Sequence, residues 1–220
     1  MADIVIYGAS DHGRYTIDIV ERAGRDRVVG VIDDRTPVGT ELYGYPVIGS
    51  GAELVALKEQ YGFTGGLVAI GDNWVRRRVA SDIRALDPTF EFPTAIHPFT
   101  SIGRDASIGE GTVIMAGAVV NGSCIVGAHC FIATKASLDH DSRLGDAASM
   151  SPDATTGGRV SVGTCSTLSI GSTVIHGITI GDHTVIGAGS TVVSDIGDCV
   201  VAFGTPCRPV RERAIGDRYL

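Results

Sequence analysis

A repeat of six residues runs through the second half of the sequence and limits what this chain can fold into. From Ile102 to Val192 in steps of six, fifteen of sixteen positions carry an aliphatic residue or methionine. A second series, two residues earlier, is mostly Ala, Ser, Thr and Cys, interrupted at Val160 and Ile178. A helix would scatter this pattern around its circumference, and a simple strand alternates every two residues. The period therefore predicts a parallel β-solenoid in which each hexapeptide supplies one short strand and one turn.

The composition narrows the range of partners. The 30 glycines fit a fold with many tight turns. A net charge of −7 supplies no basic surface for nucleic acid or an anionic membrane. The sequence contains no apolar run of about 18 residues, and its first residues lack the pattern of a secretory signal, so we expect a cytoplasmic protein. Five cysteines without a Cys-x-x-Cys pair predict neither a disulfide framework nor a metal site.

The first 92 residues have a different organisation. A buried strand at residues 4–7 is followed by a glycine-bounded loop and an amphipathic helix with Ile17, Ile19 and Val20 facing inward. Two more strands and a charged helix at residues 73–86 follow. We therefore expect an α/β domain with a short, Rossmann-like parallel sheet at residues 1–92 and the solenoid at residues 93–220, with two prolines near the boundary.

A ligand crevice is expected where the parallel strands of this first domain end. The loop Gly-Ala-Ser-Asp-His-Gly can present backbone N–H groups to a phosphate at the start of the following helix. It is neither a Gly-x-Gly-x-x-Gly dinucleotide loop nor a Walker loop, which favours a mononucleotide or nucleotide sugar over a dinucleotide. Purely structural turns are the alternative. The candidate substrate contacts are Gly8, Ser10, His12, Gly13, Asp33, Asp34, Gly71 and Asn73.

His140 is the candidate catalytic residue of the solenoid. With coils of 18 residues, it stacks beneath Gly158, about 5 Å away along the axis. It follows the inward Leu138 by two residues, so its side chain is expected to point outward. A histidine can remove a proton from an attacking amine, and a carboxylate on its other nitrogen would orient the ring. Asp139 or Asp141 could reach it only if the chain turns a corner there. An ordinary polar residue on the surface is the alternative.

The whole chain resembles the hexapeptide-repeat sugar acetyltransferases, which comprise N-acetyltransferases of nucleotide-linked amino sugars and the related sialic acid O-acetyltransferases. The motifs that carry the resemblance are GASDHG, VIDD and VAIGDN in the first half and LDHDSRLG in the second. The resemblance implies that the solenoid is a left-handed parallel β-helix with three hexapeptides per coil.

The resemblance also implies roles for individual residues. His140 would be the general base, Asp141 would orient it, and the N–H of Gly158 would face the acetyl carbonyl. Acetyl-CoA would lie along later coils between the subunits of a homotrimer, without a metal. The implied acetyl-CoA contacts are Ser149, Gly158, Ile170, Gly187, Ala188 and Arg208. Many relatives have a histidine where this chain has Ser149, which leaves the acceptor open.

Three hypotheses for the function follow. The first is an acetyl-CoA-dependent N-acetyltransferase that acts on a nucleotide-linked amino sugar, in particular a 4-amino-4,6-dideoxy sugar. The second is an O-acetyltransferase that uses the same base on sialic acid or a related sugar hydroxyl. The third is a non-catalytic scaffold that binds a nucleotide sugar, against which the His-Asp pair and Gly158 argue.

Overall fold

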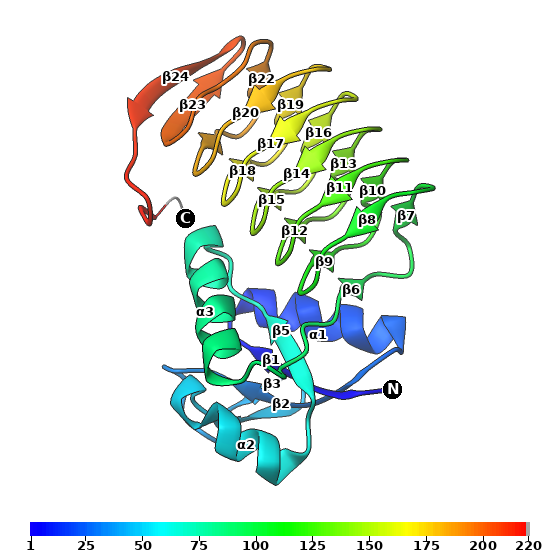
Figure 1. Cartoon of the computed structure of the whole chain (residues 1–220), viewed down its shortest axis with the longest axis vertical. Coiled ribbons are helices and arrows are strands. Elements are labelled where there is room, and N and C mark those ends of the chain that lie inside the picture. Colours follow the sequence, from blue (N-terminus) through cyan, green and yellow to red (C-terminus); the bar gives the residue numbers. More distant parts are fainter. Residues whose placement is uncertain (219–220) are drawn as a thin grey trace.

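The computed structural model describes residues 1–218, which form an α/β domain followed by a triangular β-prism (Figure 1). The α/β sheet has the strand order β3-β4-β2-β1-β5, and all its pairings are parallel except β3 with β4. Its strands are β1 (Asp3–Tyr7), β2 (Arg27–Ile32), β3 (Glu41–Leu42), β4 (Tyr45–Gly49) and β5 (Gly65–Val68). Its helices are α1 (Asp11–Ala23), α2 (Leu54–Tyr61) and α3 (Asn73–Leu86), with a 3-10 turn at Gly51–Glu53.

Local chemistry explains where the two helices beside the prism begin and end. The apolar side of α1 buries Ile17, Ile19 and Val20, as the sequence predicted. The helix ends where Gly24 adopts a left-handed conformation, with φ of 62°, and donates its N–H to the Val20 carbonyl. At the start of α3, the Asp72 carboxylate accepts a hydrogen bond from the backbone N–H three residues later.

Residues from Ala95 onward wind into a left-handed β-helix whose strands are two residues long. Residues 18 apart pair between coils, as Leu138 does with Val120. We call its three sides the covered face and the first and second open faces. The covered face holds β6 (Ala95–Ile96), β9 (Val113–Ile114), β12 (Phe131–Ile132), β15 (Ser149–Met150), β18 (Thr167–Leu168), β21 (Val185–Ile186) and β23 (Val200–Gly204), with β24 (Cys207–Glu212) antiparallel at its end. The first open face holds β7 (Ser101–Ile102), β10 (Val119–Val120), β13 (Ser137–Leu138), β16 (Thr155–Thr156), β19 (Thr173–Val174) and β22 (Thr191–Val192). The second open face holds β8 (Ser107–Ile108), β11 (Ile125–Val126), β14 (Arg143–Leu144), β17 (Ser161–Val162) and β20 (Thr179–Ile180).

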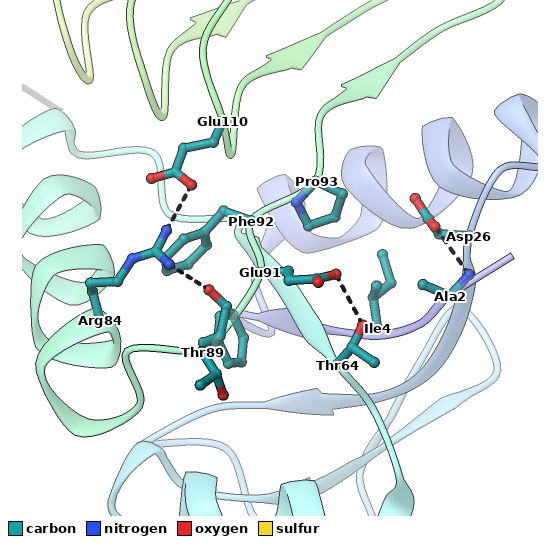
Figure 2. Close-up of a pocket in the computed structure, with 11 residues that line it drawn as sticks. Ala2, Ile4, Asp26, Thr64, Arg84, Thr89, Glu91, Phe92, Pro93 and Glu110 are labelled. Carbon is teal, nitrogen blue, oxygen red and sulfur yellow. Dashed lines mark hydrogen bonds and ion pairs between the residues drawn. The ribbon is translucent and has the colours of Figure 1, made fainter.

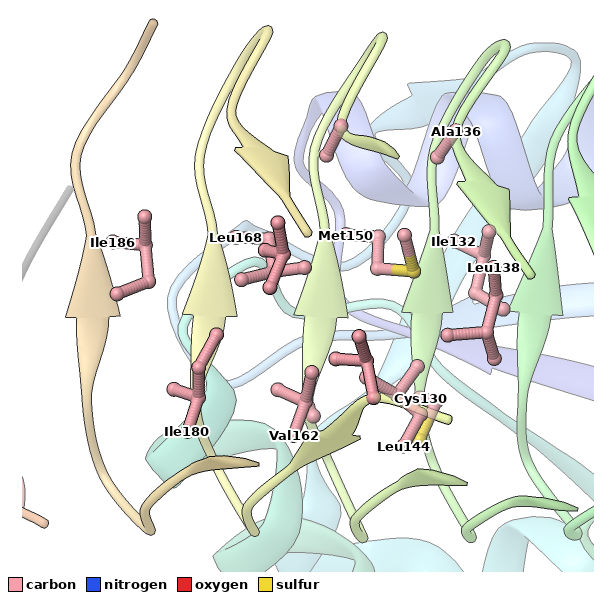
Figure 3. Packing of buried hydrophobic residues seen from close by; sticks show 14 of the residues in the cluster. Cys130, Ile132, Ala136, Leu138, Leu144, Met150, Val162, Leu168, Ile180 and Ile186 are labelled. Atoms are coloured by element: carbon pink, nitrogen blue, oxygen red, sulfur yellow. The ribbon is translucent and has the colours of Figure 1, made fainter. Parts of the chain in front are cut away.

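The six-residue series forms the core of the prism, and each of its members is the second residue of a strand. Figure 3 shows Leu138, Met150 and Leu168 among the inward side chains, and all three are fully buried. Ile102, the first member, is 38% exposed because it lies in the first strand of its sheet, with a coil on one side only. The period predicted from the sequence is therefore the period of the packing.

The α/β domain packs against the covered face of the prism. Phe131 and Val113 of that face join the apolar cluster of α1 and the sheet. At one margin, Arg84 of α3 donates to Glu110 at 2.6 Å and its guanidinium lies over the ring of Phe92 (Figure 2). A cavity of about 390 Å³ lies here, beside Thr64, where β5 begins. It is at the end of the sheet opposite to the expected ligand crevice, and no predicted site residue lines it.

A C-terminal hairpin and tail complete the chain, and the sequence did not predict them. β24 folds back on β23, and the chain then descends toward α3 (Figure 1). Arg213 is buried and donates a hydrogen bond to the carbonyl of His183 at 2.9 Å. Gly216 packs against the indole ring of Trp74 in α3. The tail therefore links the end of the prism to the α/β domain.

Candidate active site

His140 lies in the turn between β13 and β14, at the edge where the two open faces meet. The next residue, Asp141, has a left-handed backbone with φ of 58°, so the chain bends and the two side chains turn toward each other. His140 Nδ1 lies 2.8 Å from Asp141 Oδ2, and both side chains are half exposed. With the proton on Nδ1, this bond leaves the lone pair of Nε2 free to accept a proton. The corner thus brings the predicted base and its carboxylate together.

Asp139 holds the backbone of the turn. Its Oδ1 accepts hydrogen bonds from the His140 N–H at 2.8 Å and from the Asn121 amide at 2.6 Å. These two bonds lower the pKa of Asp139, the bond from His140 most strongly. Of the two flanking aspartates, only Asp141 reaches the imidazole, and Asp139 fixes the loop that carries it.

Gly158 lies directly against the imidazole in the next coil. A Cβ added to Gly158 would be 2.5 Å from both Nε2 and Cε1 of His140, so only glycine leaves the ring this space. The neighbouring Arg159 N–H donates to the His140 carbonyl at 2.9 Å and fixes the stacking of the two coils. Within residues 1–218, the N–H of Gly158 makes no backbone hydrogen bond outside the strand ladders. It is therefore available to an acyl oxygen beside the ring.

Three of the predicted acetyl-CoA contacts gather at another edge of the prism. Ile170, Gly187 and Ala188 lie in turns that join the covered face to the first open face, so a whole face separates them from His140. Ile170 is 60% exposed, and Phe203 of β23 is 54% exposed where it packs against Gly187. Arg208 is the strand partner of Phe203. This edge combines an apolar surface with one basic side chain.

Ser149 and Asn73 do not lie on an open surface, contrary to the roles predicted for them. Ser149 is buried on the covered face and donates to Asn73 Oδ1 at 2.6 Å. The Asn73 amide donates to Thr167 Oγ1 and to the Ser166 carbonyl. Arg76 adds hydrogen bonds to both side chains. In this chain the two residues join α3 to the prism, because burial requires their polar atoms to be bonded there.

The expected crevice of the α/β domain is present as a cavity of about 470 Å³ where β1, β2 and β5 end. Five of the eight predicted substrate contacts line it, namely Gly8, Ser10, Asp33, Asp34 and Gly71. Further lining residues, which the sequence did not single out, are Tyr7, Arg35, Ile70, Asp72, Val75, Arg78, Val79 and Arg218. Ser10 is the N-cap of α1 but makes no side-chain capping bond, so its hydroxyl is available to a ligand.

The other three predicted substrate contacts lie outside this cavity. Asn73 is in the contact with the prism described above. Gly13 packs α1 against the loop, because a Cβ there would lie 2.3 Å from the Gly8 carbonyl oxygen. His12 lies between Gly71 and Phe131, with 4.8 Å between the ring centroids of His12 and Phe131. Burial lowers the pKa of His12, so its neutral form is favoured.

The two aspartates of the cavity are held by groups of the same chain. Asp33 accepts hydrogen bonds from the backbone N–H groups of residues 9, 35 and 36. Burial opposes its ionisation, but these bonds lower its pKa overall. Asp34 accepts hydrogen bonds from the Tyr7 hydroxyl at 2.7 Å and from the Gly51 N–H at 2.8 Å. Burial and this bond raise the pKa of Tyr7. Asp33 therefore organises the loops of the cavity that it lines.

Residues 1–218 contain no cluster of three or more His, Cys, Asp or Glu side chains that could hold a metal. In the same part of the chain, no helix is both long and apolar enough to cross a bilayer.

Comparisons with known proteins agree with this architecture. The family described as PglD N-terminal domain matches residues 3–83, and the bacterial transferase hexapeptide family matches residues 105–140. The structure of PerB from Caulobacter crescentus, solved with CoA and GDP-perosamine, is 36% identical, with a TM-score of 0.89 over 96% of this chain and 98% of that one. The chain belongs to the hexapeptide-repeat sugar acetyltransferase family.

Other members of the hexapeptide-repeat sugar acetyltransferase family extend the comparison. The acetyltransferase domain of PglB from Neisseria gonorrhoeae is 31% identical, with a TM-score of 0.87 over 96% of this chain and 100% of that one. That domain has also been solved with acetyl coenzyme A. A galactoside O-acetyltransferase from Lactococcus lactis is 51% identical over 45 residues, which is 20% of this chain and 22% of that protein. The first two matches span both domains, whereas the third covers only a short segment.

Proposed function

We propose that this chain is an acetyl-CoA-dependent N-acetyltransferase of a nucleotide-linked amino sugar, with His140 as general base. The observation that carries the proposal is the His140–Asp141 pair beside Gly158, in a chain that also holds a nucleotide-sized cavity. The matches to PerB and to the PglB domain, both along nearly the whole chain, support it. In two further structures of the Caulobacter enzyme, one histidine is replaced by asparagine or by alanine, and both contain CoA and GDP-perosamine. These variants support a histidine-based mechanism.

The reaction needs a base because an ammonium group cannot attack a thioester. His140 Nε2 takes a proton from the amine as the nitrogen attacks the acetyl carbon, while Asp141 stabilises the imidazolium that forms. The oxyanion of the tetrahedral intermediate accepts a hydrogen bond from the Gly158 N–H. The intermediate collapses, its C–S bond breaks, and the CoA thiolate leaves and takes the proton from the His140 imidazolium, which restores the neutral base. The products are the N-acetyl sugar nucleotide and CoA.

The placement of the three groups of site residues supports an oligomer with shared active sites, for which we propose the homotrimer implied by the family resemblance. The cavity belongs to the domain on the covered face, whereas His140 lies on the opposite edge of the prism. Ile170, Gly187 and Ala188 occupy a third place, at another edge. Because the prism stands between these groups in one chain, a complete site requires a second copy whose edge approaches the cavity.

We further propose that the acceptor is a nucleotide-linked 4-amino-4,6-dideoxy sugar, the class that the family resemblance implies. The GDP-perosamine bound in the PerB structure supports this class of acceptor.

The five cysteines are free, which fits a reducing compartment and the cytoplasmic location expected from the sequence. The 45-residue match to a galactoside O-acetyltransferase covers too little of the chain to favour a hydroxyl acceptor.

The test is CoA release with GDP-, UDP- and dTDP-linked 4-amino sugars and with sialic acid as acceptors. We expect turnover with at least one sugar nucleotide and an N-acetyl product by mass spectrometry. His140→Ala and His140→Asn should each lower kcat by about 10² to 10⁴. The matched control is His176→Asn, an exposed histidine of the corresponding turn two coils further, which should stay within threefold. Turnover that survives both substitutions would contradict the base assignment, and acetylation of sialic acid alone would favour the O-acetyltransferase.

A further inference from the structure

One wall of the nucleotide cavity comes from the far end of the chain. Arg218 lines the cavity together with Arg78 of α3 and Arg35 of the loop after β2. The other lining residues belong to the α/β domain, whereas Arg218 arrives from the tail that follows β24. The C-terminal tail is thus part of the cavity rather than an appendage of the prism.

The tail is held in place by specific contacts. Arg213 is only 7% exposed, donates to the His183 carbonyl, and bonds the Asp217 carbonyl within the tail. The Asp217 carboxylate accepts the Ala214 N–H at 2.8 Å and closes a turn. Gly216, with φ of 86°, packs on Trp74, where a Cβ would lie 3.1 Å from the indole Nε1. These contacts anchor the turn on α3, and Arg218 follows it directly into the cavity.

The acidic and basic side chains of the cavity differ in whether they have partners within the chain. Asp33, Asp34 and Asp72 all accept hydrogen bonds from groups of the same chain. In contrast, none of the three arginines that line the cavity forms an ion pair within residues 1–218. The cavity therefore offers free guanidinium groups, and these fit an anion with several oxygens.

We propose that Arg218, together with Arg78, binds the diphosphate of the nucleotide sugar, so that the C-terminal tail contributes directly to substrate binding. This inference rests on the proposed function, because it names a contact within the same acceptor site. A guanidinium can donate two parallel N–H groups to a phosphate. Ser10, at the N-terminus of α1, lines the same cavity, and the helix dipole there adds to the attraction for an anion.

The test compares ligands with and without the diphosphate. Calorimetry would measure binding of GDP, UDP and dTDP, and of the matching nucleosides, to the full chain. For the diphosphate that binds most tightly, Arg218→Ala should weaken binding about tenfold or more and leave the nucleoside unchanged, because only the charged contact is lost. Arg218→Lys should keep part of the affinity, since it retains the charge but loses the planar pair of donors. The matched control, Arg25→Ala, removes one charge from an exposed position just after the C-terminal end of α1 and should have no effect.

Kinetics separate this inference from the proposed function. In Arg218→Ala, KM for the sugar nucleotide should rise about tenfold while KM for acetyl-CoA stays unchanged. If the wild-type protein acetylates a sugar nucleotide and Arg218→Ala has the same KM and the same diphosphate affinity, this inference is wrong and the proposed function stands. If the wild-type protein neither binds a nucleoside diphosphate nor releases CoA, the proposed function fails and takes the inference with it. Equal melting temperatures of wild type and variant would show that the tail substitution leaves the fold intact.

Discussion

The Cα of Gly158 lies against the imidazole of His140, so close that a Cβ would overlap Nε2 and Cε1. This relationship couples two coils of the prism at the proposed site of chemistry. It brings the imidazole of the base next to the backbone of Gly158, whose N–H makes no backbone hydrogen bond outside the strand ladders within residues 1–218. A base and an oxyanion donor that share one surface can act on the two ends of a single acyl-transfer step.

Gly158→Ala tests this relationship. The backbone of Gly158 is not left-handed, so alanine fits the chain, and its methyl group must push the imidazole aside. We expect kcat to fall about 100-fold, because a displacement near 1 Å costs about that much, with little change in melting temperature. Gly197→Ala is the matched control, since an added Cβ there meets nothing within 4 Å. Turnover of Gly158→Ala within threefold of wild type would show that the ring position is unimportant.

Asp141→Asn tests the orienting carboxylate. The amide cannot stabilise an imidazolium as a carboxylate does, so we expect kcat to fall about 10- to 100-fold with KM values unchanged. The double variant with His140→Ala should be no slower than His140→Ala alone, because the two residues act as a unit. Asp153→Asn is the control, because Asp153 has the same left-handed backbone in the turn of another edge. Additive losses in the double variant would argue against a shared role.

Much of the fold was readable from the sequence because it depends on a local period. Leu138 and Leu144 were predicted inside, and both are buried. The helix expected at residues 73–86 has these bounds. The His140–Asp141 contact followed from the same register, once a corner was allowed at that turn.

Contacts between distant parts of the chain were not readable. In the run of arginines in α3, Arg76 is buried against the prism and Arg78 lines the nucleotide cavity, while Arg77 lies between them in sequence. Successive helix residues point about 100° apart, so sequence alone cannot say which one meets which partner. The burial of Ser149 was not readable for the same reason, because the domain that covers it is fixed by tertiary packing.

Ser149→Ala tests whether this serine has a structural role. Its removal leaves Asn73 Oδ1 without the donor at 2.6 Å and removes an acceptor for Arg76, so the free energy of unfolding should fall by about 1–2 kcal/mol. We expect KM for acetyl-CoA to stay within twofold. Ser161→Ala is the control, since Ser161 has the same place in a strand of an open face. Unchanged stability with a raised KM for acetyl-CoA would restore the role first predicted for Ser149.

The ion pair between Lys58 and Asp87 predicts a pH dependence of stability. The hydrogen bond from Lys58, at 2.5 Å, and bonds from Thr89 lower the pKa of Asp87 to about 2. Because the folded pKa lies below the unfolded value near 3.9, the contribution is complete above pH 4 and is lost as the pH falls toward 2. Asp87→Asn should therefore cost about 1 kcal/mol at pH 7, a cost that shrinks below pH 4. Urea unfolding at pH 7 and at pH 3 measures this loss of stability, with Asp82→Asn at an exposed position as control. A cost that is the same at pH 7 and pH 3 would contradict the assignment.

Mixed oligomers test whether the site is shared between copies. Ser10→Trp fills the nucleotide cavity and His140→Ala removes the base, so each variant alone should be inactive. If the cavity of one chain serves the His140 of another, unfolding and refolding the two variants together should restore about a quarter of the wild-type rate, because half of the chains supply each intact part. The control is the double variant, in which every chain carries both substitutions. Unfolded and refolded in the same way, it should stay inactive. Recovery in the mixture requires the two intact parts to meet across an interface, since the prism separates them within any one chain. A mixture as inactive as its components, with trimers present by sedimentation, would place the whole site within a single chain.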